Sequence, residues 1–183
     1  MKTIKTFFGK NNRLQCELRI DLHHWKLSSS LLWPKTTLNA LENFLHKQIS
    51  PQFSGKELWS INVIIVGQKK MQTLNREYRN KNYTTDVLSF PAIDWKYSKL
   101  LKQMAKESDY CLGDIVICKD VMIRQAKQFK LSIMEEYLHL LVHGFLHLLG
   151  YDHEISQKEA KIMEGLEKTI LDEISRSSKR SKT

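Results

Sequence analysis

The amino-acid sequence predicts an α+β fold, in which a mixed central sheet of about four strands is layered with about five helices. Residues 13–22 alternate between apolar and polar side chains, which is typical of a half-buried strand. Residues 58–66 form a β-branched apolar run, which indicates a central strand. Two segments that begin at Ser132 and Ser156 have the pattern of helix starts.

The remaining elements follow from apolar spacing and from the positions of proline. Pro34 suits the first turn of a helix whose apolar residues Leu38, Leu41 and Leu45 share one face. Pro91 is expected to stop the strand that precedes it. In chain order we expect a strand at 13–22, a helix from 34 to 49, a strand at 58–66, a helix at 69–78, a strand at 84–90, a loop at 93–110, a strand at 112–118 and a helix at 120–130.

The last two helices are the best marked. Ser132 with Glu135, and Ser156 with Glu159, have the S-x-x-E spacing of a capping box. We expect the first helix to extend to about Leu149 and to end at Gly150, a residue well suited to follow a helix. The second helix is predicted from its inward-facing apolar residues, which are Ile162, Met163, Leu166, Ile170 and Leu171.

The length of 183 residues suits one domain with a short tail. We assign residues 1–175 to a single domain. Residues 176–183 contain no acid, and we expect them to form a disordered basic tail. Their positive charges are Arg176, Lys179, Arg180 and Lys182.

The charge balance indicates a polyanionic partner. The chain has 29 Lys and Arg against 20 Asp and Glu, which gives a net charge of +9. Nucleic acid is the first candidate and an anionic membrane surface the second, while a merely solvated basic surface is the alternative. Residues 137–150 are too short to span a bilayer, and the N-terminus lacks the apolar run of a signal peptide.

The cysteines are expected to be buried, reduced thiols. Cys16, Cys111 and Cys118 lie among apolar residues, are odd in number and have no C-x-x-C spacing. This usage predicts a cytoplasmic protein.

Three histidines provide the strongest chemical signal. His143 and His147 are four residues apart on a predicted helix and so share a face. Gly150 can reverse the chain and bring His153 back toward them. Three imidazoles that leave a fourth position open are typical of catalytic Zn²⁺, so one zinc ion is predicted. The alternative is three histidines that serve only packing.

Two neighbours of this motif limit its interpretation. His139 shares the same helical stripe, but successive turns are about 5.4 Å apart, so we expect it to pack or support rather than to bind the ion. The spacing of the three histidines equals that of metzincin peptidases, which need H-E-x-x-H. Gly144 stands in place of that glutamate, which argues against a peptidase unless another acid substitutes.

With these segments in view, the sequence resembles the YbeY family of bacterial metal-dependent endoribonucleases over residues 13–172. The blocks that carry the resemblance are Leu74–Lys81 running into Thr85–Pro91, Leu112–Cys118, and His143–His153. One departure is visible, because the family usually reads Lys-Asp-x-Pro-Thr-Asp where this chain has Lys81-Asn-Tyr-Thr-Thr-Asp86. The missing Asp and Pro concern the shape of this loop and not the histidines.

The resemblance implies Zn²⁺ on His143, His147 and His153, and a catalytic arginine at Arg79 in a cleft beside the metal. It also implies cleavage of single-stranded RNA in 3′-end maturation of the small-subunit 16S ribosomal RNA and in ribosome quality control. A guanidinium is a planar, permanently charged partner for phosphate. Without the resemblance, Arg79 would be interpreted as a solvated arginine at a helix end.

Several other residues are candidates for supporting roles. Asp86 and Asp114 could orient a histidine, or could simply be turn residues. Asp152 is expected to shape the turn before His153. Arg76, Arg79 and Lys81 could form an RNA-binding edge, which a predicted helix could extend or merely expose to solvent through Lys119, Arg124, Lys127 and Lys130.

The sequence therefore predicts a cytoplasmic zinc-dependent endoribonuclease that acts on ribosomal RNA, with the ribosome or its assembly proteins as partners and no membrane. Two alternatives remain at this point. One is a metzincin-like zinc peptidase, and the other is a non-catalytic ribosome-assembly factor whose metal organises a binding face.

Overall fold

The computed structural model describes residues 3–11, 13–20, 35–49, 58–93 and 109–180. Its centre is a mixed five-stranded sheet with the order β1-β2-β3-β5-β4. Strands β2, β3 and β5 are parallel, while β1 and β4 are antiparallel edges. The strands are β1 (Thr3–Phe8), β2 (Leu14–Ile20), β3 (Leu58–Val66), β4 (Val87–Pro91) and β5 (Asp109–Cys118).

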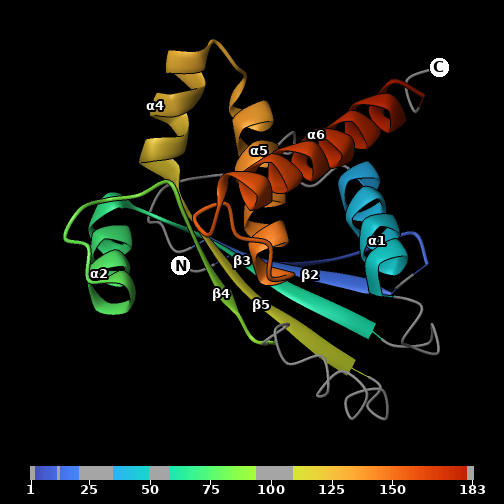
Figure 1. Cartoon of the computed structure of the whole chain (residues 1–183), viewed down its shortest axis with the longest axis horizontal. Helices are drawn as coiled ribbons and strands as arrows, with labels where there is room; N and C mark the ends of the chain where they lie inside the picture. The colour runs from blue at the N-terminus through green and yellow to red at the C-terminus, as the bar shows by residue number, and fades with distance from the viewer. Residues whose placement is uncertain (1–2, 12, 21–34, 50–57, 94–108, 181–183) are drawn as a thin grey trace.

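The helices cover this sheet unequally. Helix α5 lies across one face, with α1 and α6 packed beside it (Figure 1). Helix α2 contributes Met71 to a smaller apolar cluster with Val66 and Val116, which point to the opposite face. The described helices are α1 (Lys35–Ile49), α2 (Gln68–Arg79), α4 (Lys119–Phe129), α5 (Ile133–Leu148) and α6 (Gln157–Arg180).

The predicted α+β class and layering are confirmed, with one more strand than expected. Strand β1 was missed because most of its described side chains, including Lys5, Thr6 and Phe8, are exposed at the sheet edge and leave little apolar pattern. Strand β5 begins at Asp109, inside the segment expected to be a loop. Tyr110 pairs there with Trp59, and their ring centroids are 4.6 Å apart.

The C-terminal segment also differs from expectation. Helix α6 continues to Arg180, so residues 176–180 are helical rather than disordered. Burial of Ile170 and Ile174 against the core explains the continuation, and Ser178 Oγ lies 3.4 Å from Thr36 Oγ1 on α1. Residues 181–183 of the expected tail lie outside the described residues, as do Leu22 and Pro34.

The prediction that the cysteines are buried is correct for two of the three. Cys16 and Cys118 are buried, whereas Cys111 is exposed because it alternates outward between the buried neighbours Tyr110 and Leu112. Among the described residues, no helix is both long and apolar enough to cross a membrane.

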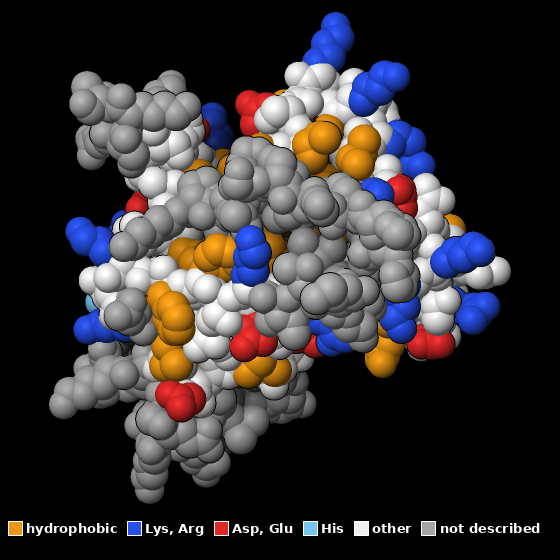
Figure 2. Space-filling model, turned by 180° about the vertical axis from the view of Figure 1, so that it is seen from behind, with side chains coloured by type: hydrophobic (Ala, Val, Ile, Leu, Met, Phe, Trp, Pro, Cys, Tyr) orange, Lys and Arg blue, Asp and Glu red, His pale blue; other side chains and the backbone are white. Residues whose placement is uncertain are grey.

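On one face of the molecule the positive charge is distributed rather than concentrated. On the face shown in Figure 2, Lys and Arg side chains occupy several places around the margin, with a few acidic side chains between them. The net charge of +9 is therefore not evidence for one large basic patch on this face.

Candidate metal centre and cleft

Helix α5 is fixed at both ends in a way that places the three histidines together. At its start, Glu135 N donates to Ser132 Oγ at 3.1 Å and Ser132 N donates to Glu135 Oε2 at 2.7 Å, so the predicted capping box is formed. At its end, Gly150 has a φ of 84°, which glycine adopts readily. Tyr151 N then donates to Leu146 O at 3.1 Å, and the chain turns back toward the helix.

This turn brings His153 to His143 and His147. One ring nitrogen of each histidine lies within 4.8 Å of the others. The Nε2 atoms of His143 and His147 are 3.1 Å apart. Two nitrogens bound tetrahedrally to one Zn²⁺ at 2.0–2.1 Å would be about 3.3 Å apart, so the spacing of His143 and His147 suits two ligands of one such ion. The predicted convergence of the three side chains is therefore observed.

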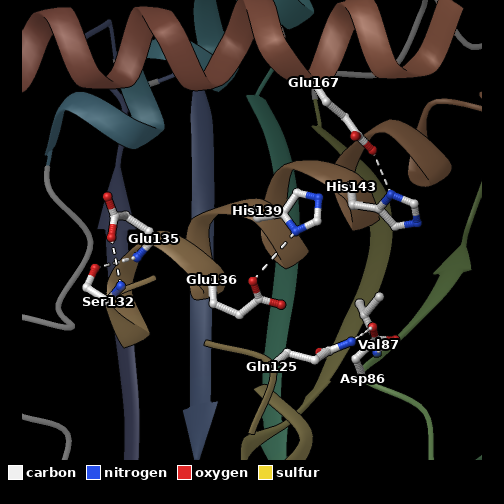
Figure 3. Close-up of polar contacts among 9 residues, drawn as sticks. All are labelled: Asp86, Val87, Gln125, Ser132, Glu135, Glu136, His139, His143 and Glu167. Atoms are coloured by element: carbon white, nitrogen blue, oxygen red, sulfur yellow. Dashed lines mark hydrogen bonds and ion pairs between the residues drawn. The ribbon is translucent and has the colours of Figure 1, made fainter. Parts of the chain in front are cut away.

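The carboxylate of Glu167, on α6, holds one of these rings. His143 Nδ1 lies 2.6 Å from Glu167 Oε1 (Figure 3). Burial would raise the pKa of Glu167, but its hydrogen bond and charge interaction with His143 outweigh burial and lower it. An ionised Glu167 can only accept a hydrogen bond, so Nδ1 of the neutral His143 ring carries the hydrogen. The Nε2 atom of His143 then keeps its lone pair, which faces the other histidines.

The second ring is held in its neutral form by its surroundings. Burial lowers the pKa of His147 to about 4, and the neighbouring His143 and His153 contribute to the decrease. At pH 7 the imidazole of His147 is therefore uncharged, which is the state that binds a metal ion.

The aspartates that were candidates for orienting a histidine have other partners. Asp86 accepts hydrogen bonds from Val87 N at 2.8 Å and from Gln125 Nε2 at 2.8 Å (Figure 3). Asp114 accepts from Asn62 Nδ2 at 2.7 Å, across two neighbouring strands. Sequence reasoning missed Glu167, because a helix with several acidic residues does not reveal which of them faces α5.

His139 lies outside the group of three, as its position one turn earlier predicted. Its ring centroid is 6.4 Å from that of His143. It is not a packing residue, however, because its side chain is 48% exposed. Its Nδ1 lies 3.9 Å from Glu136 Oε2 on the same helix (Figure 3).

Arg79 shares a cleft with the three histidines. The cleft has a volume of about 420 Å³, and Lys81 and Asp86 also line it. Helix α2 ends at Arg79 because Asn80 adopts a left-handed conformation with a φ of 57°. Arg76, from the proposed basic edge, is exposed but does not line the cleft.

The loop that departs from the family pattern is held by hydrogen bonds. Asn75 Nδ2 donates to Tyr83 O at 2.8 Å, and Lys81 N donates to Asn75 O at 3.2 Å. Asp152 also lines the cleft, and its Oδ1 accepts from Glu154 N at 2.9 Å, so Asp152 shapes the turn as expected.

Gly144 packs against the sheet. A Cβ built at this position would lie 2.7 Å from Ile115 Cγ2 and 3.1 Å from Ser89 Oγ. A glutamate at residue 144 would therefore collide with β4 and β5, and the position that carries the general base of H-E-x-x-H peptidases is closed to a carboxylate here.

The model of the family described as Endoribonuclease YbeY matches residues 27–175. This chain belongs to the Endoribonuclease YbeY family. Its members are named endoribonucleases, which are hydrolytic nucleases. This membership agrees with the resemblance of the three sequence blocks.

Individual relatives cover most of the chain. An Endoribonuclease YbeY of Xylella fastidiosa is 42% identical over 140 residues, which are 75% of this chain and 82% of that protein. One of Caldicellulosiruptor bescii is 44% identical over 120 residues, 65% of this chain and 75% of that protein. The solution structure of TM1509 from Thermotoga maritima has a TM-score of 0.52 and 25% identity, and covers 91% of this chain and 93% of its own.

Proposed function

We propose that this chain is a zinc-dependent endoribonuclease that cleaves single-stranded RNA in the cytoplasm. The observation that carries the proposal is the convergence of three imidazoles in one cleft with Arg79. Membership of the Endoribonuclease YbeY family supports RNA as the substrate class.

His143, His147 and His153 would hold the ion, each through one ring nitrogen. When bound, zinc lowers the pKa of a coordinated water and polarises a phosphoryl oxygen. Glu167 keeps the hydrogen of His143 on Nδ1 and leaves Nε2 available as a donor atom. Three protein ligands leave one position for solvent or substrate, which is the arrangement of catalytic rather than structural zinc.

Arg79 is assigned the role of binding the phosphate that reacts. Its guanidinium is charged at all relevant pH values and can donate two parallel hydrogen bonds to phosphate oxygens. Lys81 lines the same cleft and adds a second cation for the RNA backbone. The closed position at Gly144 distinguishes this cleft from that of a peptidase.

The cellular role that we propose is maturation of the 3′ end of small-subunit 16S ribosomal RNA and ribosome quality control, in contact with the ribosome or its assembly proteins. Cells that lack this protein should accumulate small-subunit RNA with extended 3′ ends, which mapping of the RNA ends would detect. Unchanged 3′ ends would contradict this role without contradicting the nuclease activity.

The activity itself is tested with purified, zinc-loaded protein on a single-stranded RNA, on the same RNA in a duplex, and on a peptide panel. We expect cleavage of the single strand alone. His147→Ala and Arg79→Ala should each abolish most of the cleavage, whereas His46→Ala, an exposed histidine on α1, should leave it unchanged.

Cleavage of peptides with intact RNA would identify a peptidase instead. If neither substrate is cut but His147→Ala alters ribosome association, the non-catalytic assembly factor would be the correct function.

A further inference from the structure

The cleft does not end at the histidines. Beyond Arg79 and His147 it continues into a second hollow of about 430 Å³, which we call the apolar subsite. Arg79, Ser89, His147 and Asp152 line both hollows, so the two share a polar wall. The remaining wall of the apolar subsite includes Pro91, Ile93, Tyr151 and Ile155.

The side chains of this wall come from two segments that the fold brings together. Pro91 is the last residue of the edge strand β4 and Ile93 follows it, while Tyr151 and Ile155 belong to the turn between α5 and α6. Ile155 is 59% exposed although its side chain is apolar. Tyr151 is half-buried, and its hydroxyl donates to Gln48 Oε1 at 3.4 Å, which steadies the ring.

Ser89 lies at the boundary of the two hollows. The residue is 7% exposed, and its Oγ is buried with no hydrogen-bond partner among the described residues. This Oγ faces Gly144, because a Cβ built there would lie 3.1 Å from it, so the hydroxyl is packed between β4 and α5 and does not open into either hollow. The apolar subsite thus joins an apolar surface to the polar wall, with Arg79 and Asp152, that it shares with the first hollow.

This combination suits a nucleobase, which has flat apolar faces and polar edges. Arg79 lines both hollows, so a phosphate that it holds in the first hollow would place the adjacent nucleotide near the apolar subsite. Stacking of an unpaired base on an aromatic or apolar side chain is a usual source of affinity for single strands. An apolar peptide side chain would suit the same wall, but the shared guanidinium favours a ligand that carries phosphate.

We propose that the apolar subsite binds the base of the nucleotide next to the phosphate that lies at the three histidines. This inference rests on the proposed function, since it requires that RNA is the substrate. It explains a preference for single strands, because a base in a duplex is paired and stacked and cannot enter the subsite.

The test uses zinc-loaded protein and one single-stranded RNA, prepared as a series in which each member lacks the base at one position. For the wild type we expect one position beside the cut to lower kcat/KM about tenfold when its base is missing. Ile155→Ala should lower kcat/KM on the intact RNA several-fold and should remove most of the penalty at that position. Ile162→Ala is the matched control and should behave as the wild type, because Ile162 is exposed on α6, contrary to the inward position that its spacing predicted.

A flat abasic series with RNA still cleaved would overturn the subsite and leave the proposed function intact. Equal cleavage of the RNA series by Ile155→Ala and Ile162→Ala would also overturn the subsite and leave the proposed function intact. Loss of peptide selectivity in Ile155→Ala, in a protein that cuts no RNA, would overturn both proposals and assign the hollow to a peptide side chain.

Discussion

At the scale of single residues, the contact between His143 and Glu167 decides how the candidate metal centre is prepared. The Nδ1–Oε1 distance of 2.6 Å is that of a charge-assisted hydrogen bond. It joins α5, which carries His143 and His147, to α6, which carries none of the three histidines. A carboxylate in this position fixes the ring orientation and raises the basicity of the nitrogen that binds metal.

We therefore expect Glu167→Ala to weaken zinc binding by about tenfold or more, the usual cost of losing such a partner. Glu167→Gln should be less affected, because an amide oxygen can still accept from Nδ1 although it has no charge. Competition with a chromophoric chelator measures the affinity directly and does not depend on catalysis.

Glu164→Ala supplies the control, since Glu164 is exposed on the same helix. Equal zinc affinity in Glu164→Ala and Glu167→Ala would show that Glu167 does not position His143. Thermal unfolding of the metal-free variants separates this positioning role from a general loss of stability.

At the scale of elements, a close approach of α5 to the sheet places the histidines beside Arg79. Gly144 makes that approach possible, because Ile115 and Ser89 occupy the space that a side chain would need. Gly165 on α6 is the opposite case, since a Cβ there would meet nothing within 4 Å. Close packing therefore requires a glycine at residue 144 but does not require one at residue 165.

Gly144→Ala should destabilise the protein by about 1–3 kcal/mol, the usual cost of overpacking a core. Gly165→Ala should instead stabilise it by up to about 1 kcal/mol, because alanine has the better helix propensity and no neighbour is displaced. Urea unfolding measures both changes. Similar effects of the two substitutions would mean that α5 can move away from the sheet without cost.

At the scale of the whole molecule, the charge of +9 attracts RNA but does not by itself locate the binding surface. The cleft contains Arg79 and Lys81, while the Lys and Arg side chains visible in Figure 2 are spread over the face that it shows. Helix α6 includes three of the tail cations, so these belong to the fold rather than to a free segment.

The dependence of RNA binding on salt distinguishes cations that contact the strand. Arg79→Ala should reduce the slope of log K against log salt by about 0.7, the value for one phosphate contact on a single strand. Lys5→Ala should leave the slope unchanged, because Lys5 lies on β1 at the opposite edge of the sheet from β4. Anisotropy titrations with metal-free protein measure binding while cleavage is prevented. Equal slopes for wild type and Arg79→Ala would place the phosphate elsewhere.

Local patterns in the sequence determined much of this protein. Period-two alternation identified β2, the apolar run identified β3, and S-x-x-E spacing identified the start of α5. The histidine group was predictable for the same reason: its members lie within one helix and one turn, so helical geometry and Gly150 suffice to bring them together.

Only the tertiary structure decided the features that join distant segments. Edge strand β1 exists through its pairing with β2, and Glu167 reaches His143 from 24 residues away along the chain. The same is true of the apolar subsite between β4 and the turn before α6, whereas the place of Arg79 in the cleft was expected from the family resemblance and not from any local pattern. Periodicity reports which face of an element is buried, but which residues of two elements meet depends on how those elements pack, and this a single sequence does not encode locally.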